Sequence, residues 1–213
     1  DISEFLLKLH IQLNEELMQG KYPACHFILY QFARSSLQLS PKRGEWMAQK
    51  SRFPDGCSLI EEWRLASYRD CYAQEYDLLS TESITELFVR MMAQPPRWIT
   101  GLMSIRNAIV QFLGLKTGNP NPEFEKDDPR DYKVGDHIGI FKIEQIRHNE
   151  LIVSTNDTHL DASFSLLMSK DRKLVYMTSV VKTKRQLGNI YMFVIAPFHR
   201  LIVKYMLGNL NRR

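Results

Sequence analysis

The feature that most constrains the fold is an amphipathic stretch at residues 187–209, close to the end of the sequence. Its apolar side chains recur at steps of three and four, which places them on one face of an α-helix. These residues are Leu187, Ile190, Tyr191, Val194, Phe198, Leu201, Ile202 and Tyr205. Pro197 removes one helical hydrogen bond inside this pattern. We therefore predict one helix that bends near Phe193 and ends at Gly208.

A long helix with an apolar face needs a surface to cover, and the preceding segment supplies strands. Strand patterns separated by short turns occupy four consecutive segments: 137–147, 150–156, 159–168 and 173–184. In the third segment, Leu160, Ala162 and Phe164 alternate with polar residues and are predicted to share one buried face. The sequence therefore predicts an antiparallel meander with the C-terminal helix on its concave face.

The part of the chain before residue 58 differs in character from the rest. Residues 1–57 carry helical patterns followed by a polar, turn-rich segment at 41–56. We interpret them as a helical N-terminal extension and linker, which either packs on the main domain or binds a partner. Residues 58–213 are then the main domain.

One further strand and two helices are predicted between the linker and the meander. The aromatic-rich residues 66–78 predict a strand. A helix is predicted from Ser80 or Thr81 to about Ala93, and another at 97–113. The predicted fold class is α+β.

Composition indicates a soluble globular protein, with 213 residues of which 44% are hydrophobic. No apolar run approaches the roughly 18 residues that span a bilayer, and the first residues do not resemble a signal peptide. The cysteines Cys25, Cys57 and Cys71 are irregularly spaced, and we predict that they are free thiols. These features predict a cytoplasmic protein with no membrane-spanning segment.

The end of the chain is basic although the net charge is only +4. Residues 182–213 contain seven Lys and Arg and no Asp or Glu. Such a face is either solvated or a docking surface for an acidic partner, lipid or nucleic acid. We expect no nucleic-acid partner.

Common catalytic and nucleotide-binding motifs are missing, and no cofactor is predicted. The segment richest in reactive groups contains Asp157, His159 and Asp161. Residues two apart on a strand share a face, so these side chains could form an acid–base pair or hydrogen-bond at the start of the strand. A third nitrogen or sulfur ligand is not evident nearby, so no metal site is predicted. His199 is a weaker catalytic candidate beside the apolar helix face.

Arg106 lies within the apolar stripe of the predicted helix at 97–113. A guanidinium there either extends to solvent or pairs with a carboxylate, because burying it alone is costly. Asp161 is the partner that we propose from the sequence. Such a pair could anchor the polar head of a ligand at a cavity mouth.

Three groups of motifs resemble one bacterial family, catalogued as domain of unknown function 2867. They are Pro96-Arg-Trp-Ile with Ile105-Arg-Asn and Leu113-Gly-Leu-Lys, then Asp157-Thr-His-Leu-Asp, then Gln186-Leu-Gly-Asn-Ile-Tyr with Pro197-Phe-His-Arg-Leu-Ile-Val. The resemblance covers about residues 66–209. It implies a START or Bet v 1-like (SRPBCC) helix-grip fold, in which a curved antiparallel sheet wraps around a long C-terminal helix and encloses an apolar cavity. It implies no reaction.

Two classes of function follow from these observations. The first is binding of a hydrophobic or lipid-like small molecule between sheet and helix. The second is a cyclase-like or hydrolase-like enzyme that uses His159 and Asp161. Docking of a macromolecule on the basic face is a weaker third. The predicted ligand-binding residues are Trp98, Arg106, Asp157, His159, Asp161, Tyr176, Tyr191 and Phe198.

Overall fold

The structure, a computed structural model, describes residues 48–76, 82–93, 99, 124–156, 160–184 and 186–211, all within one compact unit of residues 46–213. The predictions for the helical part of residues 1–47, and nearly all of the helix at 97–113, fall outside these residues. Cys25 also lies outside them, whereas Cys57 and Cys71 are free thiols as predicted.

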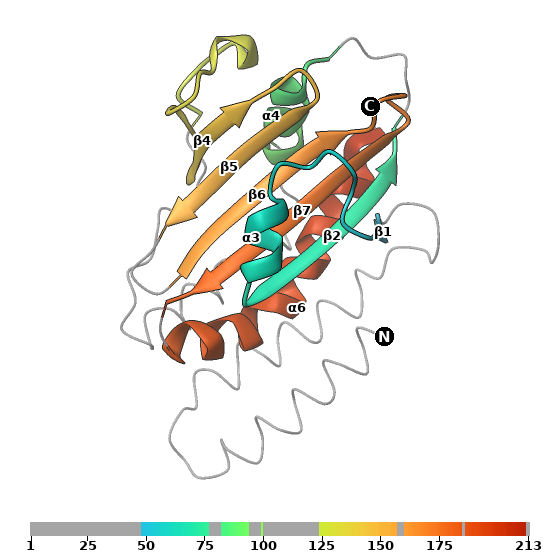
Figure 1. Ribbon diagram of the computed structural model, residues 1–213. Helices are drawn as coiled ribbons and strands as arrows, with labels where there is room; N and C mark the ends of the chain where they lie inside the picture. Colours follow the sequence, from blue (N-terminus) through green and yellow to red (C-terminus); the bar gives the residue numbers. More distant parts are fainter. Residues whose placement is uncertain are drawn as a thin grey trace. The chain divides into compact units, whose positions relative to one another are not determined.

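The core of the fold is one antiparallel sheet in the order β1-β2-β7-β6-β5-β4-β3 (Figure 1). The strands are β1 Gln49–Lys50, β2 Tyr68–Glu75, β3 His137–Ile138, β4 Phe141–Ile146, β5 Glu150–Asn156, β6 Leu160–Met168 and β7 Leu174–Thr183. Strands β4 to β7 form the predicted meander. The predicted strand at 137–147 is divided by Gly139, whose φ of 63° permits a tight turn between β3 and β4.

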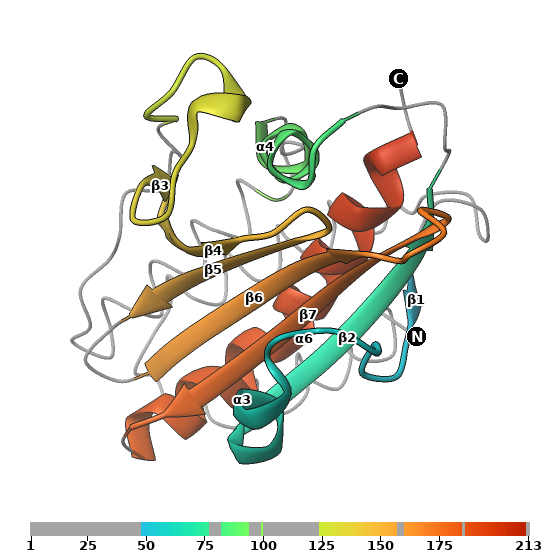
Figure 2. The ribbon, with the colours of Figure 1, turned by 45° about the horizontal axis from the view of Figure 1, so that its top comes forward.

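Helices cover the two faces of this sheet. Figures 1 and 2 show α3, Ile60–Leu65, on one face and α6, Gln186–Gly208, on the other. The single helix predicted at 187–209 is confirmed, and it continues into a short 3-10 turn, η2, Asn209–Asn211. The bend that Pro197 is expected to cause near Phe193 stays a prediction. None of the helices in the described part of the chain is long and apolar enough to cross a membrane.

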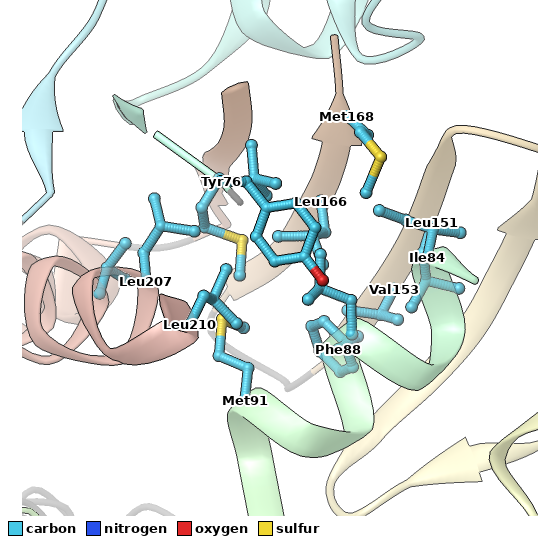
Figure 3. Packing of buried hydrophobic residues seen from close by; sticks show 14 of the residues in the cluster. Tyr76, Ile84, Phe88, Met91, Leu151, Val153, Leu166, Met168, Leu207 and Leu210 are labelled. Carbon is cyan, nitrogen blue, oxygen red and sulfur yellow. The ribbon is translucent and has the colours of Figure 1, made fainter. Parts of the chain in front are cut away.

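The main core lies between the α6 side of the sheet, the end of α6 and α4, Ile84–Ala93. Figure 3 shows side chains from all three elements meeting there, including Phe88, Leu166, Leu207 and Leu210. The alternation predicted for the third strand is confirmed, because Ala162, Phe164, Leu166 and Met168 all pack on this side.

The face of α6 that meets the sheet is not the face predicted. The side chains packed against the sheet are Met192, Ala196, Val203 and Leu207, together with His199. At 3.6 residues per turn, the predicted stripe lies roughly on the opposite side of the helix. Its residues Phe198, Leu201, Ile202 and Tyr205 are half-buried. Because α6 has apolar residues on both sides, periodicity alone did not identify the side that covers the sheet.

Residues 48–57 form part of the sheet unit rather than a free linker. Gln49 and Lys50 pair with β2, Ala48 is buried in the main core, and the Ala48 N–H donates to the Lys204 carbonyl at 3.1 Å. Cys57 is buried on the α3 face. These contacts place this segment inside the sheet unit.

Helix α4 begins two or three residues later than predicted. The Ser83 hydroxyl accepts from the Glu86 N–H at 3.2 Å, and the Glu86 carboxylate accepts from the Ser83 N–H at 2.7 Å. This reciprocal pair is a capping box, so Ser83, not Ser80 or Thr81, caps the helix. The helix reaches Ala93, in agreement with the predicted end at about that residue.

A short 3-10 helix, η1, Pro129–Asp131, lies in the charged loop before β3. The Asp128 carboxylate caps it by accepting from the Arg130 N–H at 2.9 Å. The loop is tied to the sheet by a bridge between Phe124 and Ile138.

Candidate functional site

A group of polar side chains meets between the sheet and the middle of α6. Strand β2 contributes Tyr68 and Asp70, strand β7 contributes Ser179, and α6 contributes His199 and Arg200. Asp70 and Ser179 are directly paired across the sheet, so their side chains leave it on the same face. We call these five residues the Asp70 cluster.

Short contacts join the members of the Asp70 cluster. The Tyr68 hydroxyl donates to Asp70 Oδ2 at 2.5 Å and accepts from Arg200 Nε at 3.2 Å. His199 Nε2 is 3.0 Å from Ser179 Oγ and 3.7 Å from Asp70 Oδ1. The second distance is within ion-pair range but too long for a hydrogen bond.

Asp70 is a buried charge with incomplete hydrogen bonding. Only 4% of the residue is exposed, and its Oδ1 atom has no hydrogen-bond partner. Two other buried polar side-chain atoms of the described residues share this state, Arg90 Nε and Asn209 Oδ1. Oδ1 of Asp70 is the one carboxylate oxygen among the three. Burying such a group without a partner costs free energy, so this atom calls for an explanation.

The environment favours the ionised form of Asp70. Burial alone would raise the pKa of its carboxyl, but the His199 imidazole and the hydroxyls of Tyr68 and Ser179 outweigh burial and hold the pKa below its usual value. Burial and the negative charge of Asp70 raise the pKa of Tyr68, so this hydroxyl stays a proton donor. Oδ1 is therefore a charged acceptor.

The Asp70 cluster borders a patch of small apolar side chains. This second core cluster joins Ala162 and Val181 of the sheet to Met192 and Ala196 of α6. Phe164 packs against both this cluster and the main core, and its ring centroid is 5.9 Å from that of His199. A charged carboxylate thus lies next to an apolar sheet–helix interface that contains two alanines, Ala162 and Ala196.

The arrangement differs from a catalytic Ser-His-Asp triad. In a triad, the serine and the carboxylate contact different ring nitrogens of the histidine. Here both Ser179 Oγ and Asp70 Oδ1 approach Nε2 of His199. Ser179 is also fully buried. The cluster can hold and orient a polar group, or exchange a proton with it through His199.

Two cations of α6 lie over aromatic rings of β2 beside the cluster. The Arg200 guanidinium is 5.5 Å from the centre of the Tyr68 ring, and Lys204 Nζ is 5.4 Å from that of Tyr72. Burial and the nearby Asp70 charge raise the pKa of Tyr72 to about 12.

The opposite face of the sheet holds a second buried carboxylate, Glu150, which is 1% exposed. Its oxygens accept from the Ser58 N–H at 2.9 Å, the Ser58 hydroxyl at 2.5 Å and the Ser165 hydroxyl at 2.7 Å. Arg147 Nη1 is 3.8 Å from Oε2. Both oxygens of Glu150 are satisfied, so this group fastens the segment before α3 onto the sheet.

Four of the predicted site residues have described side chains, namely Asp161, Tyr176, Phe198 and His199, and these four do not form one site. Asp161 lies on the sheet face that carries α3, and its Oδ1 is 2.6 Å from Lys184 Nζ, with both side chains 40% exposed. Its partner is therefore Lys184 rather than a group inside the sheet–α6 interface. Tyr176 also packs on the α3 face, against the cluster that contains Cys57 and Leu59.

The remaining predicted residues divide into two groups. Phe198 is half-buried on the side of α6 roughly opposite its sheet-facing stripe, and His199 is the one predicted residue that belongs to the Asp70 cluster. The others lie outside the described residues or, for Tyr191, have a side chain outside them; they are Trp98, Arg106, Asp157, His159 and Tyr191.

Sequence reasoning missed Tyr68 and Asp70. Tyr68, Asp70 and Tyr72 alternate along β2 and therefore share one face of the strand. A lone carboxylate between two aromatic residues on one strand face is the signal that could have identified the site. Among the described residues, no group of three or more His, Cys, Asp or Glu side chains could hold a metal ion.

The fold and the site together define the class of the protein. It is an α+β domain with a seven-stranded antiparallel sheet, a long C-terminal helix and the Asp70 cluster between them. The model of the family described as "Protein of unknown function (DUF2867)" matches residues 63–206, and the chain belongs to this family. No curated protein and no solved structure matches the chain.

Proposed function

We propose that this domain binds a hydrophobic or amphipathic small molecule between the sheet and α6. The observation that carries the proposal is the buried Oδ1 of Asp70, which has no hydrogen-bond partner. Proteins rarely leave a buried charged acceptor unpaired, and a functional role is one of the recognised explanations for such a group. The resemblance to bacterial helix-grip proteins supports the same proposal, with the sheet wrapped around the helix.

The apolar body of the ligand would lie against the small side chains beside Asp70. Ala162 and Val181 of the sheet belong to one buried cluster with Met192 and Ala196 of α6. Small-molecule sites are mostly apolar with a few well-placed polar groups, and this combination is found here. Met192 is flexible enough to adjust to an occupant.

Native mass spectrometry tests the proposal on protein purified from its own organism. We expect a co-purifying molecule that leaves on mild denaturation. Protein that carries no such molecule, and that takes up none from a lipid extract of the same cells, would contradict the proposal.

A pair of substitutions separates a ligand cavity from an ordinary core. Ala196→Leu fills the proposed ligand space, so it should abolish binding and leave the free energy of unfolding within about 0.5 kcal/mol of wild type. The matched control is Ala48→Leu in the main core, where overpacking should cost about 1 to 3 kcal/mol. A loss of stability of that size in Ala196→Leu as well would indicate that the side chains around Ala196 are tightly packed. The proposed ligand space beside Ala196 would then have no support from this experiment.

A second candidate function is acid–base catalysis, favoured by the contact between His199 and Asp70. A bound substrate at this position would meet an imidazole beside a carboxylate, the usual elements of proton transfer. The version of this hypothesis that uses His159 and Asp161 stays a prediction for His159, while Asp161 is engaged with Lys184.

The free thiols of Cys57 and Cys71 support the further expectation of a reducing, cytoplasmic setting.

A further inference from the structure

The two oxygens of Asp70 differ in a way that bears on the chemistry of a ligand. Oδ2 receives the Tyr68 hydroxyl proton at 2.5 Å. Oδ1 is buried and receives none. An ionised carboxylate oxygen can only accept, so the group that completes it has to be a hydrogen-bond donor.

Among the described residues, no neighbouring group donates to Oδ1 with hydrogen-bond geometry, and this includes the Ser179 hydroxyl across the β2–β7 pair. His199 and Ser179 lie near enough to lower the pKa of Asp70, but neither completes Oδ1. The single hydroxyl proton of Tyr68 is already directed at Oδ2. Nε2 of His199 is 3.7 Å from Oδ1 and makes its closer contact, 3.0 Å, with Ser179. If Nε2 carries a proton, the Ser179 oxygen is its nearer acceptor; if it does not, it has nothing to donate.

From this geometry we infer that the ligand ends in a hydroxyl or a protonated amine, which donates to Oδ1 of Asp70. This inference rests on the proposed function. The apolar remainder of the ligand lies along Ala162, Met192 and Ala196. A ligand with a carboxylate or phosphate head is rejected, because its charge would meet that of Asp70 in a poorly solvated place.

The sequence predicted that an Arg106–Asp161 pair anchors the polar head of a ligand, whereas this inference gives that role to the single carboxylate of Asp70. A cation does lie nearby, but the Arg200 side chain is exposed and donates to the outer side of the Tyr68 hydroxyl. An anion bound at Arg200 would therefore remain outside the sheet–helix interface.

Three probes with one chain and different heads test the inference: octan-1-ol, octylamine and octanoate. Each is titrated into the full chain below its self-association concentration, and the methyl NMR signals of Ala162, Met192 and Ala196 report binding at the proposed place. We expect the alcohol and the amine to bind at least about tenfold more tightly than octanoate.

Asp70→Asn sharpens the test. The amide oxygen can still accept from Tyr68, while the amide nitrogen replaces the acceptor Oδ1 with a donor. The preference should then shift toward octanoate by about tenfold. Asp161→Asn is the matched control, since this carboxylate is exposed and lies on the other face of the sheet. Its probe affinities should equal those of wild type.

Each outcome decides between the two proposals. Octanoate binding at these methyl groups as tightly as the other probes overturns the inference and leaves the proposed function intact. If Asp70→Asn does not change the affinities for the alcohol and the amine, the inference is overturned in the same way. Failure of all three probes to bind contradicts both. The wild-type series needs no substitution, so it remains decisive if Asp70→Asn does not fold.

Discussion

Among the described residues, each face of the sheet buries one carboxylate, and these two carboxylates are hydrogen-bonded to different degrees. Glu150, on the α3 face, accepts three hydrogen bonds from Ser58 and Ser165 and lies near Arg147. Asp70, on the α6 face, accepts one from Tyr68 and keeps Oδ1 unpaired. Burial is similar, so the difference lies in the donors that each environment supplies.

This difference separates a structural role from a binding role. A fully hydrogen-bonded carboxylate recovers much of its desolvation cost and holds its neighbours in one arrangement. An incompletely bonded one leaves part of that cost uncompensated, which a ligand donor can later recover. We therefore expect Glu150 to matter most for stability, and Asp70 to matter most for binding.

The largest expected effect is the loss of stability in Glu150→Ala. It leaves the Ser58 N–H and two hydroxyl groups without their charged acceptor, and we expect the free energy of unfolding to fall by about 3 kcal/mol. Urea denaturation followed by circular dichroism measures it. The matched control is Glu144→Ala: Glu144 also accepts from a serine, Ser154, at 2.6 Å, but its side chain is 39% exposed. Water can take the place of the Glu144 carboxylate in its hydrogen bonds, so Glu144→Ala should lower the free energy of unfolding by less than about 1 kcal/mol.

Equal costs for Glu150→Ala and Glu144→Ala would contradict the structural role of Glu150. They would show that the three hydrogen bonds to Glu150 contribute no more than the solvated contacts of Glu144 with Ser154 and Lys142. The proposed contrast between a structural carboxylate, Glu150, and a ligand-binding carboxylate, Asp70, would then fail for Glu150.

A smaller effect is expected for Asp70→Asn, about 1 to 2 kcal/mol at neutral pH, because the amide keeps the bond from Tyr68. This difference should depend on pH. The pKa of Asp70 in the folded protein is below the usual value of about 3.9. Its stabilisation is thus present above that value and is lost as pH falls through the folded pKa.

Unfolding of wild type and Asp70→Asn, compared from about pH 5 downward, tests this sign. The two free energies should converge as the pH falls, since position 70 titrates in wild type alone. A gap that widens toward acid would mean that the folded pKa of Asp70 is raised, and would argue against an ionised acceptor beneath α6.

The sheet was largely predictable from the sequence because its signals are local. Alternation along residues 160–168 and turn residues between successive strands were sufficient for β5, β6 and β7. The division at Gly139 was missed because a glycine inside a strand pattern does not by itself reveal a positive φ. The cap at Ser83 was missed because three neighbouring residues can each start a helix.

The candidate site was less predictable because it depends on long-range pairing. Asp70 and Ser179 become neighbours only through the β2–β7 register, and His199 reaches them only through the orientation of α6. That orientation is not encoded in a single stripe, since Met192 and Ala196 on one side compete with Leu201 and Ile202 on the other. Local patterns favoured the segment around Asp161, where charged residues are adjacent in sequence.

The smallest expected effect concerns Asp161, which provides the exposed reference for the two buried carboxylates. Its contact with Lys184 is short, 2.6 Å, but both side chains are 40% exposed. Water and salt screen such a pair, and ordering two side chains offsets much of the attraction. A double-mutant cycle of Asp161→Ala and Lys184→Ala should therefore give a coupling of about 0.5 kcal/mol or less, decreasing further at high salt.

A second cycle combines Asp161→Ala with Arg106→Ala, and we expect the two effects on the free energy of unfolding to be additive. A coupling of about 3 kcal/mol would instead support the buried Arg106–Asp161 pair predicted from the sequence. It would also place the polar end of the ligand away from Asp70.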